Sequence, residues 1–257
     1  MIELETEGAA IQIDPACGAR LASLCIDGQE LLISRHVDPM RWGCYSMVPF
    51  AGRVRDGRFK FDGQDHELPR NLPPHAIHGT CFTREWEQLA TDQFTVDLGP
   101  DWPFAGFATQ QYTLSAKALT LRLEVHALDV PFPASIGWHP WFRRQLSDGS
   151  IARLKFTALE MYQRSADGIP SGELVAPGPG PWDDCFRGMQ GAPRIEWGDR
   201  LRLQLESNCS HWVVYDEPSD AICVEPQTGE PDALNRTPKL VSVDSPLCLE
   251  LRLSWGE

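Results

Sequence analysis

The chain has 257 residues, 42% of them hydrophobic, with 23 Lys and Arg against 36 Asp and Glu and a formal net charge of −13. A chain of this length buries roughly three quarters of its unfolded surface, so it needs no disulfide or metal to fold. The negative charge argues against a binding surface for nucleic acid or an anionic membrane and favours a neutral or cationic small molecule as ligand. The apolar content, with 9 Trp and 11 Phe, excludes intrinsic disorder.

The N-terminal residues and the cysteines bear on the expected compartment. Residues 1–8, MIELETEG, are acidic where a signal peptide is basic and then apolar, and no apolar run approaches the ~18 residues of a membrane span. The eight cysteines form no CxxC pair and lie near no histidine at zinc-finger spacing. We therefore expect buried, reduced thiols in a cytoplasmic protein without membrane or nucleic-acid partners.

Short strands separated by turns are predicted along the chain, because Gly and Pro occur 21 times each. RFKF at 58–61 followed by DGQ at 62–64 indicates a strand that enters a hairpin turn. Apolar and polar residues then alternate with period two, or form short apolar runs, in further strands. In chain order these are 119–125, 201–205, 212–215, 221–225 and 247–253.

Many short strands with turns between them are typical of an antiparallel sandwich or barrel. The segment 175–181, VAPGPGP, is the most linker-like, but strands resume on both sides of it, so we interpret it as a long loop. The sequence therefore predicts a single all-β domain over residues 1–257.

Polar, titratable residues lie beside Gly, Pro and aromatic residues in a few segments. His139 between Trp138 and Pro140 is compatible with a packed core histidine, and Glu225 with an ordinary carboxylate at a strand end. Together, however, a histidine and a carboxylate can act as general acid and base. Aromatic faces suit the C–H faces of a sugar, and Arg and Asp suit its hydroxyls. The segments are 49–58, 74–86, 137–142, 181–186 and 223–235.

No Gly-rich phosphate loop or GxSxG motif is present, so we expect chemistry without a cofactor. His75 and His78 have the spacing of a ligand pair only on a helix, and Pro73, Pro74 and Gly79 argue against a helix there. A metal enzyme that uses His75, His78 and His139 with a carboxylate is a minor alternative, and we expect no metal.

Three motifs in a fixed order carry a family resemblance: HAIHG at 75–79, GWHPWF at 137–142 and EPQTGEPDALN at 225–235, after PFAGRV at 49–54. The chain resembles the aldose 1-epimerase, or galactose mutarotase-like, family along nearly its whole length. The resemblance implies a large antiparallel β-sandwich (the mutarotase-like supersandwich) with very few short helices. It also implies an open sugar cleft, an isomerase that interconverts the anomers of an aldose, and a monosaccharide as partner.

The resemblance also implies catalytic roles for three residues. Glu225 would take the proton from the anomeric hydroxyl, His139 would protonate the ring oxygen, and His78 would hydrogen-bond the reacting oxygens. Ordinary pKa values of ~6.5 for His and ~4.3 for Glu are compatible with these roles near neutral pH.

Substrate-binding roles are implied for Arg53, Asp183, His75 and Trp141. Asp184 follows Asp183 directly, and the sequence leaves open which of the two faces the sugar.

The chain departs from the family motif NPFANR, because Val48 and Gly52 stand where that motif has Asn. The identity of the sugar therefore stays open. A hexose-6-phosphate 1-epimerase would need a basic pocket, for which Arg53, Arg55 and Arg58 are candidates. A non-catalytic sugar-binding or sensor protein on the same fold is the other alternative. The assembly is expected to be a monomer or a homodimer.

Overall fold

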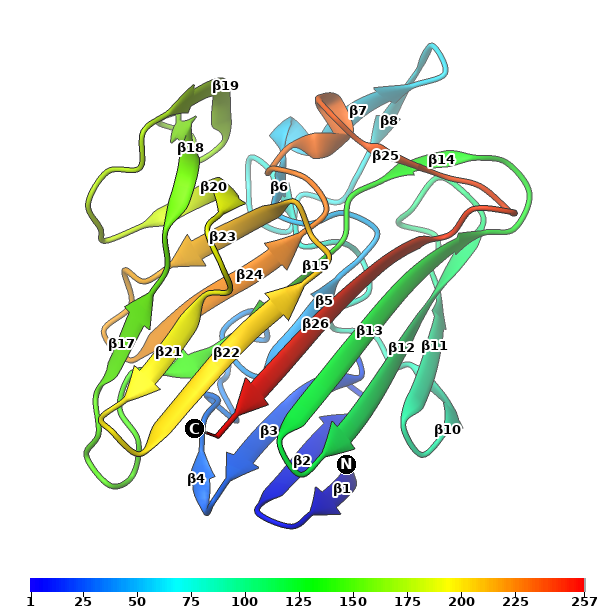
Figure 1. The fold of residues 1–257 in the computed structure, drawn as a ribbon. Helices are drawn as coiled ribbons and strands as arrows, with labels where there is room; N and C mark the ends of the chain where they lie inside the picture. The colour runs from blue at the N-terminus through cyan, green and yellow to red at the C-terminus, as the bar shows by residue number, and fades with distance from the viewer. Residues whose placement is uncertain (257) are drawn as a thin grey trace.

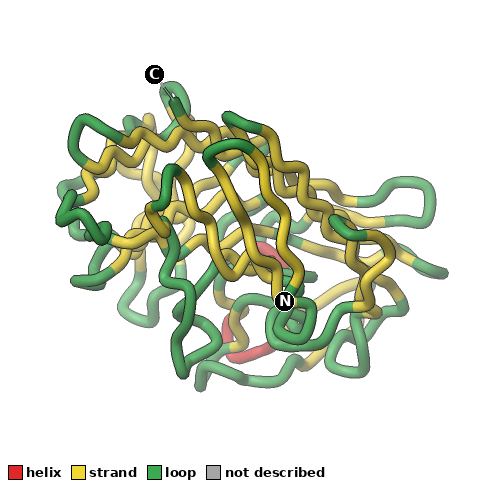
Figure 2. Tube along the Cα trace, turned by 90° about the horizontal axis from the view of Figure 1, so that it is seen from below, coloured by secondary structure: helices red, strands yellow, loops and turns green. Residues whose placement is uncertain are grey.

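The computed structural model describes residues 1–256 and consists of two large antiparallel sheets packed in layers (Figure 1). Every ladder between named strands is antiparallel, as expected for an all-β sandwich built from short, turn-linked strands. Helical structure within these residues is confined to two short 3₁₀ turns, η1 (Arg55–Gly57) and η2 (Ala233–Asn235), drawn red in Figure 2. The predicted all-β class with very few short helices is confirmed.

The first sheet has twelve strands and carries the predicted site. Two short strands lie off its main path: β4 (Gln29–Glu30) pairs with β3 (Arg20–Ile26), and β16 (Phe142–Arg143) pairs with β24 (Ala221–Gln227). The main path is, in spatial order, β1 (Ile2–Thr6), β2 (Ala9–Asp14), β3 (Arg20–Ile26), β5 (Cys44–Met47), β15 (Gly137–Pro140), β24 (Ala221–Gln227), β23 (His211–Tyr215), β20 (Asp183–Met189), β18 (Ala158–Arg164) and β19 (Pro170–Val175).

The second sheet has eight strands and covers one face of the first. In spatial order these are β10 (Glu87–Ala90), β11 (Gln93–Asp97), β12 (Gly106–Ser115), β13 (Ala118–Ala127), β26 (Leu247–Trp255), β22 (Leu201–Ser207), β21 (Arg194–Trp197) and β17 (Ala152–Lys155). Three two-stranded ladders complete the fold: β6 (Arg53–Val54) with β9 (Ala76–Ile77), β7 (Arg58–Phe61) with β8 (Gln64–Glu67), and β14 (Phe132–Ala134) with β25 (Lys239–Val241).

The core lies between the two sheets and follows from the period-two patterns. Leu121 and Leu123 of β13 pair in register with Leu251 and Leu249 of β26, and all four are fully buried. Successive side chains of a strand point to opposite faces, so these leucines fill the space between the sheets while the polar residues between them face outward. The strands predicted at 119–125, 201–205, 212–215, 221–225 and 247–253 are confirmed.

The turn chemistry is also as predicted. Asp62 and Gly63 both have positive φ and join β7 to β8 in a two-residue hairpin. Strand β19 ends at Val175, and residues 176–181 lie outside the strands, which agrees with the expected loop. None of the helices within residues 1–256 has the length and hydropathy that a membrane crossing requires.

The 12-stranded sheet has a second face, turned away from the 8-stranded sheet, which we call the cleft face. Along β24, Ile222 and Val224 belong to the main core cluster, so Cys223, Glu225 and Gln227 between and after them project to the cleft face. This alternation places buried polar groups on one side of a strand whose other side is part of the core.

Candidate functional site

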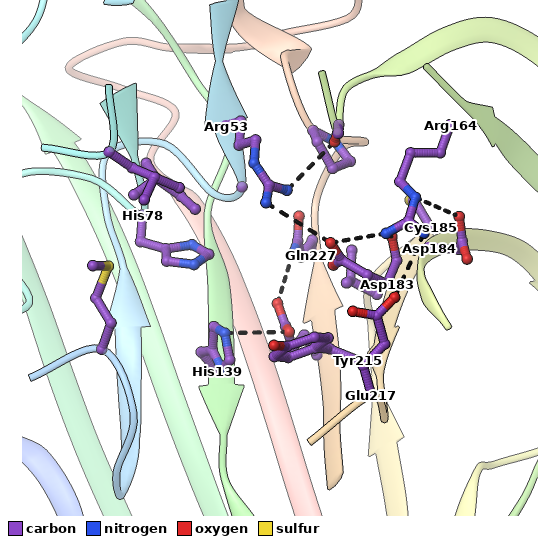
Figure 3. Close-up of a pocket in the computed structure, with 18 of the residues that line it drawn as sticks. Arg53, His78, His139, Arg164, Asp183, Asp184, Cys185, Tyr215, Glu217 and Gln227 are labelled. Atoms are coloured by element: carbon purple, nitrogen blue, oxygen red, sulfur yellow. Dashed lines mark hydrogen bonds and ion pairs between the residues drawn. The ribbon is translucent and has the colours of Figure 1, made fainter. Parts of the chain in front are cut away.

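A cavity of about 640 Å³ opens on the cleft face (Figure 3). Imidazole rings, carboxylates, guanidinium groups and aromatic rings line it, and they come from segments that are far apart in the sequence. All but one of the predicted site residues lie here, namely Arg53, His78, His139, Trp141, Asp183 and Glu225.

Glu225 and His139 form a pair on the floor of the cavity. They project to the same face from β24 and β15, which are neighbouring strands of the sheet. His139 Nε2 lies 3.3 Å from Glu225 Oε1, and only 5% and 3% of the two side chains are exposed. A histidine and a carboxylate in contact at the base of a cavity can hold and exchange a proton.

Burial shifts both members of this pair toward their uncharged forms. Burial lowers the pKa of His139 to about 3. Burial, and then the charge of Asp183, raises the pKa of Glu225 well above its usual range, against the opposing effects of Gln227 and Arg53. The ordinary pKa values expected from the sequence are therefore wrong, because both groups are removed from water. The pair holds one proton between its two members.

Aromatic rings fix the orientation of His139. Trp141 stacks on it with a centroid distance of 5.3 Å and an interplanar angle of 4°, and Tyr45 stacks on it at 4.9 Å and 27°. Tyr45 stands opposite His139 in the register between β5 and β15. Tyr215 in turn packs its edge against Trp141 at 5.9 Å. The imidazole is thereby held in one plane beside Glu225.

His78 enters the site just after β9 in a left-handed conformation, with φ of 61°. The next residue, Gly79, has φ of 80°, and a Cβ there would come within 2.0 Å of the Val48 carbonyl oxygen, so only glycine fits. The His78 ring lies perpendicular to that of His139 at 4.9 Å. Burial, and then the charge of His139, lowers the pKa of His78 well below its usual range. A neutral imidazole therefore faces the pair.

Arg53 lies between His78 and Asp183 in the cavity (Figure 3). Arg53 reaches the site because β6 pairs with β9, where Arg53 stands opposite Ile77. Its Nη2 lies 3.8 Å from Asp183 Oδ2, and its Nη1 donates to the carbonyl oxygen of Gly168 at 3.4 Å (Figure 3).

Arg164 is a site residue that the sequence did not indicate. From the end of β18 its guanidinium contacts three carboxylates: Nη1 lies 3.0 Å from Asp183 Oδ2, Nε 3.5 Å from Asp184 Oδ1 and Nη2 3.7 Å from Glu217 Oε1. Figure 3 shows this guanidinium among the three acids. Its charge offsets part of the negative charge that they bring to the cavity.

The strand register distinguishes the two aspartates. Asp183 stands opposite Tyr215, which lines the cavity, and Asp184 stands opposite Val214, which is fully buried on the other side of β23. Both aspartates touch the cavity, but Asp183 shares the cleft face with Glu225, and Asp184 anchors Arg164.

His75 is not among the residues that line the cavity. It is buried, and its Nδ1 accepts a hydrogen bond from the backbone N–H of Asp56 at 3.1 Å. The imidazole supports the η1 turn, because the extended HAIH segment places His75 and His78 in different surroundings, and the substrate-binding role of His75 stays a prediction.

Gln227 is the second residue that the sequence did not indicate. Its Nε2 donates to Glu225 Oε2 at 3.1 Å, and its Oε1 is buried without a hydrogen-bond partner among the described residues. The sequence held a signal for Gln227, because residues two apart on a strand share a face and Gln227 lies two residues after Glu225.

The metal-ligating groups also differ from the predicted alternative. Within residues 1–256, the structure gathers His139, Cys223 and Glu225, whose potential ligand atoms all lie within 4.8 Å of one another. All eight cysteines are in the described part of the chain and are free; four of them are buried and the other four are partly exposed.

Comparisons with known proteins show the family and the fold to which this cavity belongs. The chain is 26% identical to YphB of Escherichia coli strain K12 over 222 residues, which cover 75% of each protein. It superimposes on a galactose mutarotase-like protein from Clostridium acetobutylicum with a TM-score of 0.87 and 18% identity, covering 99% of this chain and 94% of the other. For galactose 1-epimerase from Lactobacillus acidophilus NCFM the TM-score is 0.80, with 18% identity and 99% and 93% coverage.

At these identities the two structural matches establish the fold alone. The family model named Aldose 1-epimerase, however, matches residues 1–248, which is nearly the whole chain and includes every residue of the cavity. The protein therefore belongs to the aldose 1-epimerase family.

Proposed function

We propose that this protein is an aldose 1-epimerase that interconverts the α and β anomers of a free aldose. The observation that carries the proposal is the contact of 3.3 Å between His139 and Glu225 on the cavity floor. Ring opening removes a proton from the anomeric oxygen and adds one to the ring oxygen, and both oxygens are bonded to the same carbon. Its acid and base must therefore lie close together, as these two side chains do.

The reaction then follows from the proton that the pair shares. Glu225, as carboxylate, takes the proton of the anomeric hydroxyl while His139, as imidazolium, gives its proton to the ring oxygen. The bond between C1 and the ring oxygen breaks and C1 becomes an aldehyde. Rotation about C1–C2 turns the other face of the carbonyl toward the ring-closing hydroxyl, and the two residues reverse their roles. The reactive state, imidazolium beside carboxylate, holds the same number of protons as the uncharged state, imidazole beside carboxylic acid. The pair can therefore pass from one state to the other without exchanging a proton with solvent.

The surrounding residues have supporting roles in this proposal. The neutral His78 hydrogen-bonds the reacting oxygens, and Trp141 keeps the His139 ring aligned while its face borders the sugar. Arg53 and Asp183 bind hydroxyls and fix the ring over the pair, and such positioning alone accounts for much of the rate enhancement.

The charges favour a neutral sugar over a phosphorylated one. Three guanidinium groups line the cavity, and each has a carboxylate partner. Arg53 and Arg164 lie 3.8 Å and 3.0 Å from Asp183, and Arg41 lies 3.8 Å from Asp220. The other arginines named as phosphate candidates, Arg55 and Arg58, lie outside the cavity lining and pair with Asp167 and Glu67. A phosphate would have to displace a carboxylate from one of these pairs.

Anomer-exchange NMR tests the proposal. Galactose, glucose, arabinose, xylose, fucose, rhamnose and glucose 6-phosphate are examined in a weakly catalytic buffer with the wild-type protein and with Glu225→Gln. We expect the wild type to accelerate exchange for at least one neutral sugar and the variant to lose that acceleration.

Two results would contradict the proposal. Line broadening of a sugar without faster exchange, equal in wild type and Glu225→Gln, would identify a binding protein. Acceleration for glucose 6-phosphate alone would identify a phosphorylated substrate and overturn the charge argument.

A further inference from the structure

One buried side chain beside the proposed acid–base pair has no part in the reaction. Cys223 lies two residues before Glu225 on β24 and projects to the same face of the sheet. It is fully buried in a small cluster with Tyr45 and Trp141, the two rings that stack on His139. The thiol therefore lies beside the pair on the same face of the sheet, outside the cavity lining.

The three side chains together have the composition of a transition-metal site. One ligand atom from each of His139, Cys223 and Glu225 lies within 4.8 Å of the other two. An imidazole, a thiolate and a carboxylate are the ligand types that zinc binds tetrahedrally, and three protein ligands leave a fourth position for water. Thiolate selects zinc or cadmium over magnesium or calcium, which prefer oxygen ligands.

An entry path and an open position are both present. His139 and Glu225 line the cavity, whereas Cys223 does not, so a cation that enters from the cavity meets the imidazole and the carboxylate before the thiol. The fourth ligand position then faces the cavity. The side chains are already gathered by two neighbouring strands, so binding needs little rearrangement.

We propose that His139, Cys223 and Glu225 form an inhibitory site for a thiophilic divalent cation such as Zn²⁺. Binding displaces the thiol proton of Cys223 and the proton shared by the pair to solvent, and the metal takes both protein ligands out of proton transfer. The inhibitory effect rests on the proposed epimerase function, but the binding of the cation to these three side chains does not.

Cadmium binding tests the site without reference to catalysis. Cd²⁺ is titrated into the metal-free protein while the ultraviolet absorption of the Cd–thiolate bond is followed, with Mg²⁺ as the hard-cation control. We expect a one-to-one absorption step with the wild type and none with Mg²⁺. Cys223→Ala should lose this step, and Cys185→Ala should retain it, because Cys185 is a buried thiol of the same cavity outside the ligand group.

Zinc inhibition tests the consequence. Zn²⁺ should inhibit anomer exchange by the wild type, EDTA should restore it, and Cys223→Ala should need at least about 10-fold more Zn²⁺ for half inhibition while keeping its metal-free activity. Cys223→Ser serves the same comparison should the smaller alanine disturb packing, and circular dichroism checks the fold of each variant.

Three results would overturn the proposal: a one-to-one Cd²⁺ step that survives in Cys223→Ala, the absence of such a step in the wild type, or exchange that rises with Zn²⁺. If the wild type exchanges no sugar, the epimerase proposal fails, and the Cd²⁺ titration still decides the site.

Discussion

Two buried glutamines in this molecule have opposite hydrogen-bonding states. Gln110 on β12 points between the sheets, where its Nε2 donates to Ser46 Oγ at 2.8 Å and its Oε1 accepts from Tyr112 OH at 2.8 Å. Gln227 on β24 points to the cleft face, where its Nε2 donates to Glu225 and its Oε1 has no partner among the described residues. Both side chains are 1% exposed.

The difference between the two amides separates a polar group that stabilises the core from one that belongs to the candidate site. A buried polar atom without a partner costs about 1–3 kcal/mol, and core positions rarely retain one. Gln110 incurs no such cost because both ends of its amide are bonded. Gln227 leaves a buried acceptor without a partner beside Glu225, at a residue that lines the cavity.

The largest effect expected from the cleft face comes from His139. The substitution His139→Asn removes the general acid while keeping a polar group of smaller size, so kcat/KM should fall by about 10²–10⁴-fold. The melting temperature should change little, because a polar replacement at a cavity rarely unfolds a domain. Anomer-exchange NMR and thermal melts measure the two quantities.

Trp141→Leu provides the control for His139→Asn, since it leaves the acid in place and removes one ring that aligns it. Its loss of activity should be smaller. Equal activity of His139→Asn and the wild type would show that the pair is not the catalytic centre.

The two glutamines themselves provide the next comparison. Gln110→Met removes the amide that donates to Ser46 Oγ and to the Gly18 carbonyl oxygen, while Tyr112 OH keeps its bond to the Ala19 carbonyl oxygen. It should lower the free energy of unfolding by about 1–3 kcal/mol, with activity unchanged. Gln227→Met removes an amide whose Oε1 already has no hydrogen-bond partner among the described residues. It should change stability by less than about 1 kcal/mol and lower kcat/KM by about 10-fold, because Glu225 loses the hydrogen bond that holds it.

Urea unfolding and exchange kinetics on both variants test this contrast. The same pattern in both glutamines, whether loss of stability or loss of activity, would break the distinction between the two faces.

The features that could be predicted from the sequence depend on residues close together in the chain. Leucine alternation at 119–125 and 247–253 fixes which face of each strand is buried, and the Asp62-Gly63 pair fixes a hairpin, so these strands were predictable from residue order alone. His139 and Glu225 stood out because each joins a titratable group to an apolar strand. Their contact of 3.3 Å was not predictable, since it depends on β15 lying beside β24.

What the sequence did not predict depends on pairing between distant segments. Arg164 reaches Asp183 only because β18 and β20 are neighbours, and nothing near Arg164 in the sequence marks it. The family resemblance implied a substrate-binding role for His75, but its ring bonds the Asp56 backbone outside the cavity lining, because residues three apart in an extended segment do not share surroundings. The pKa shifts of the pair follow from burial, which a single sequence does not reveal.

A smaller effect, on KM, is expected from substitution of Arg164, which tests whether this guanidinium orients a ligand-facing carboxylate. Arg164→Ala removes the cation that Asp183 and Asp184 share, so Asp183 loses its orientation toward the cavity. We expect KM to rise by several-fold, on the order of 1 kcal/mol, with kcat nearly unchanged, because the guanidinium is partly exposed and touches no proton carrier. Arg164→Lys should restore part of the affinity.

The KM-against-kcat split is the decisive readout for Arg164. A fall in kcat with unchanged KM would instead place this residue in proton transfer.

The smallest change is expected in the dependence of kcat/KM on pH, which should be nearly flat because both members of the pair are buried. With the pKa of His139 lowered to about 3 and that of Glu225 raised, the pair gains a second proton only in strong acid and loses its single proton only above the usual range of a carboxyl. Between about pH 5 and about pH 7, kcat/KM should therefore vary by less than about twofold, whereas an imidazolium with the ordinary pKa of ~6.5 would lose about fourfold. Exchange rates corrected for the spontaneous reaction measure this. A fourfold fall centred near the ordinary value would mean that water reaches His139 and that the pair lacks the burial on which the flat profile depends.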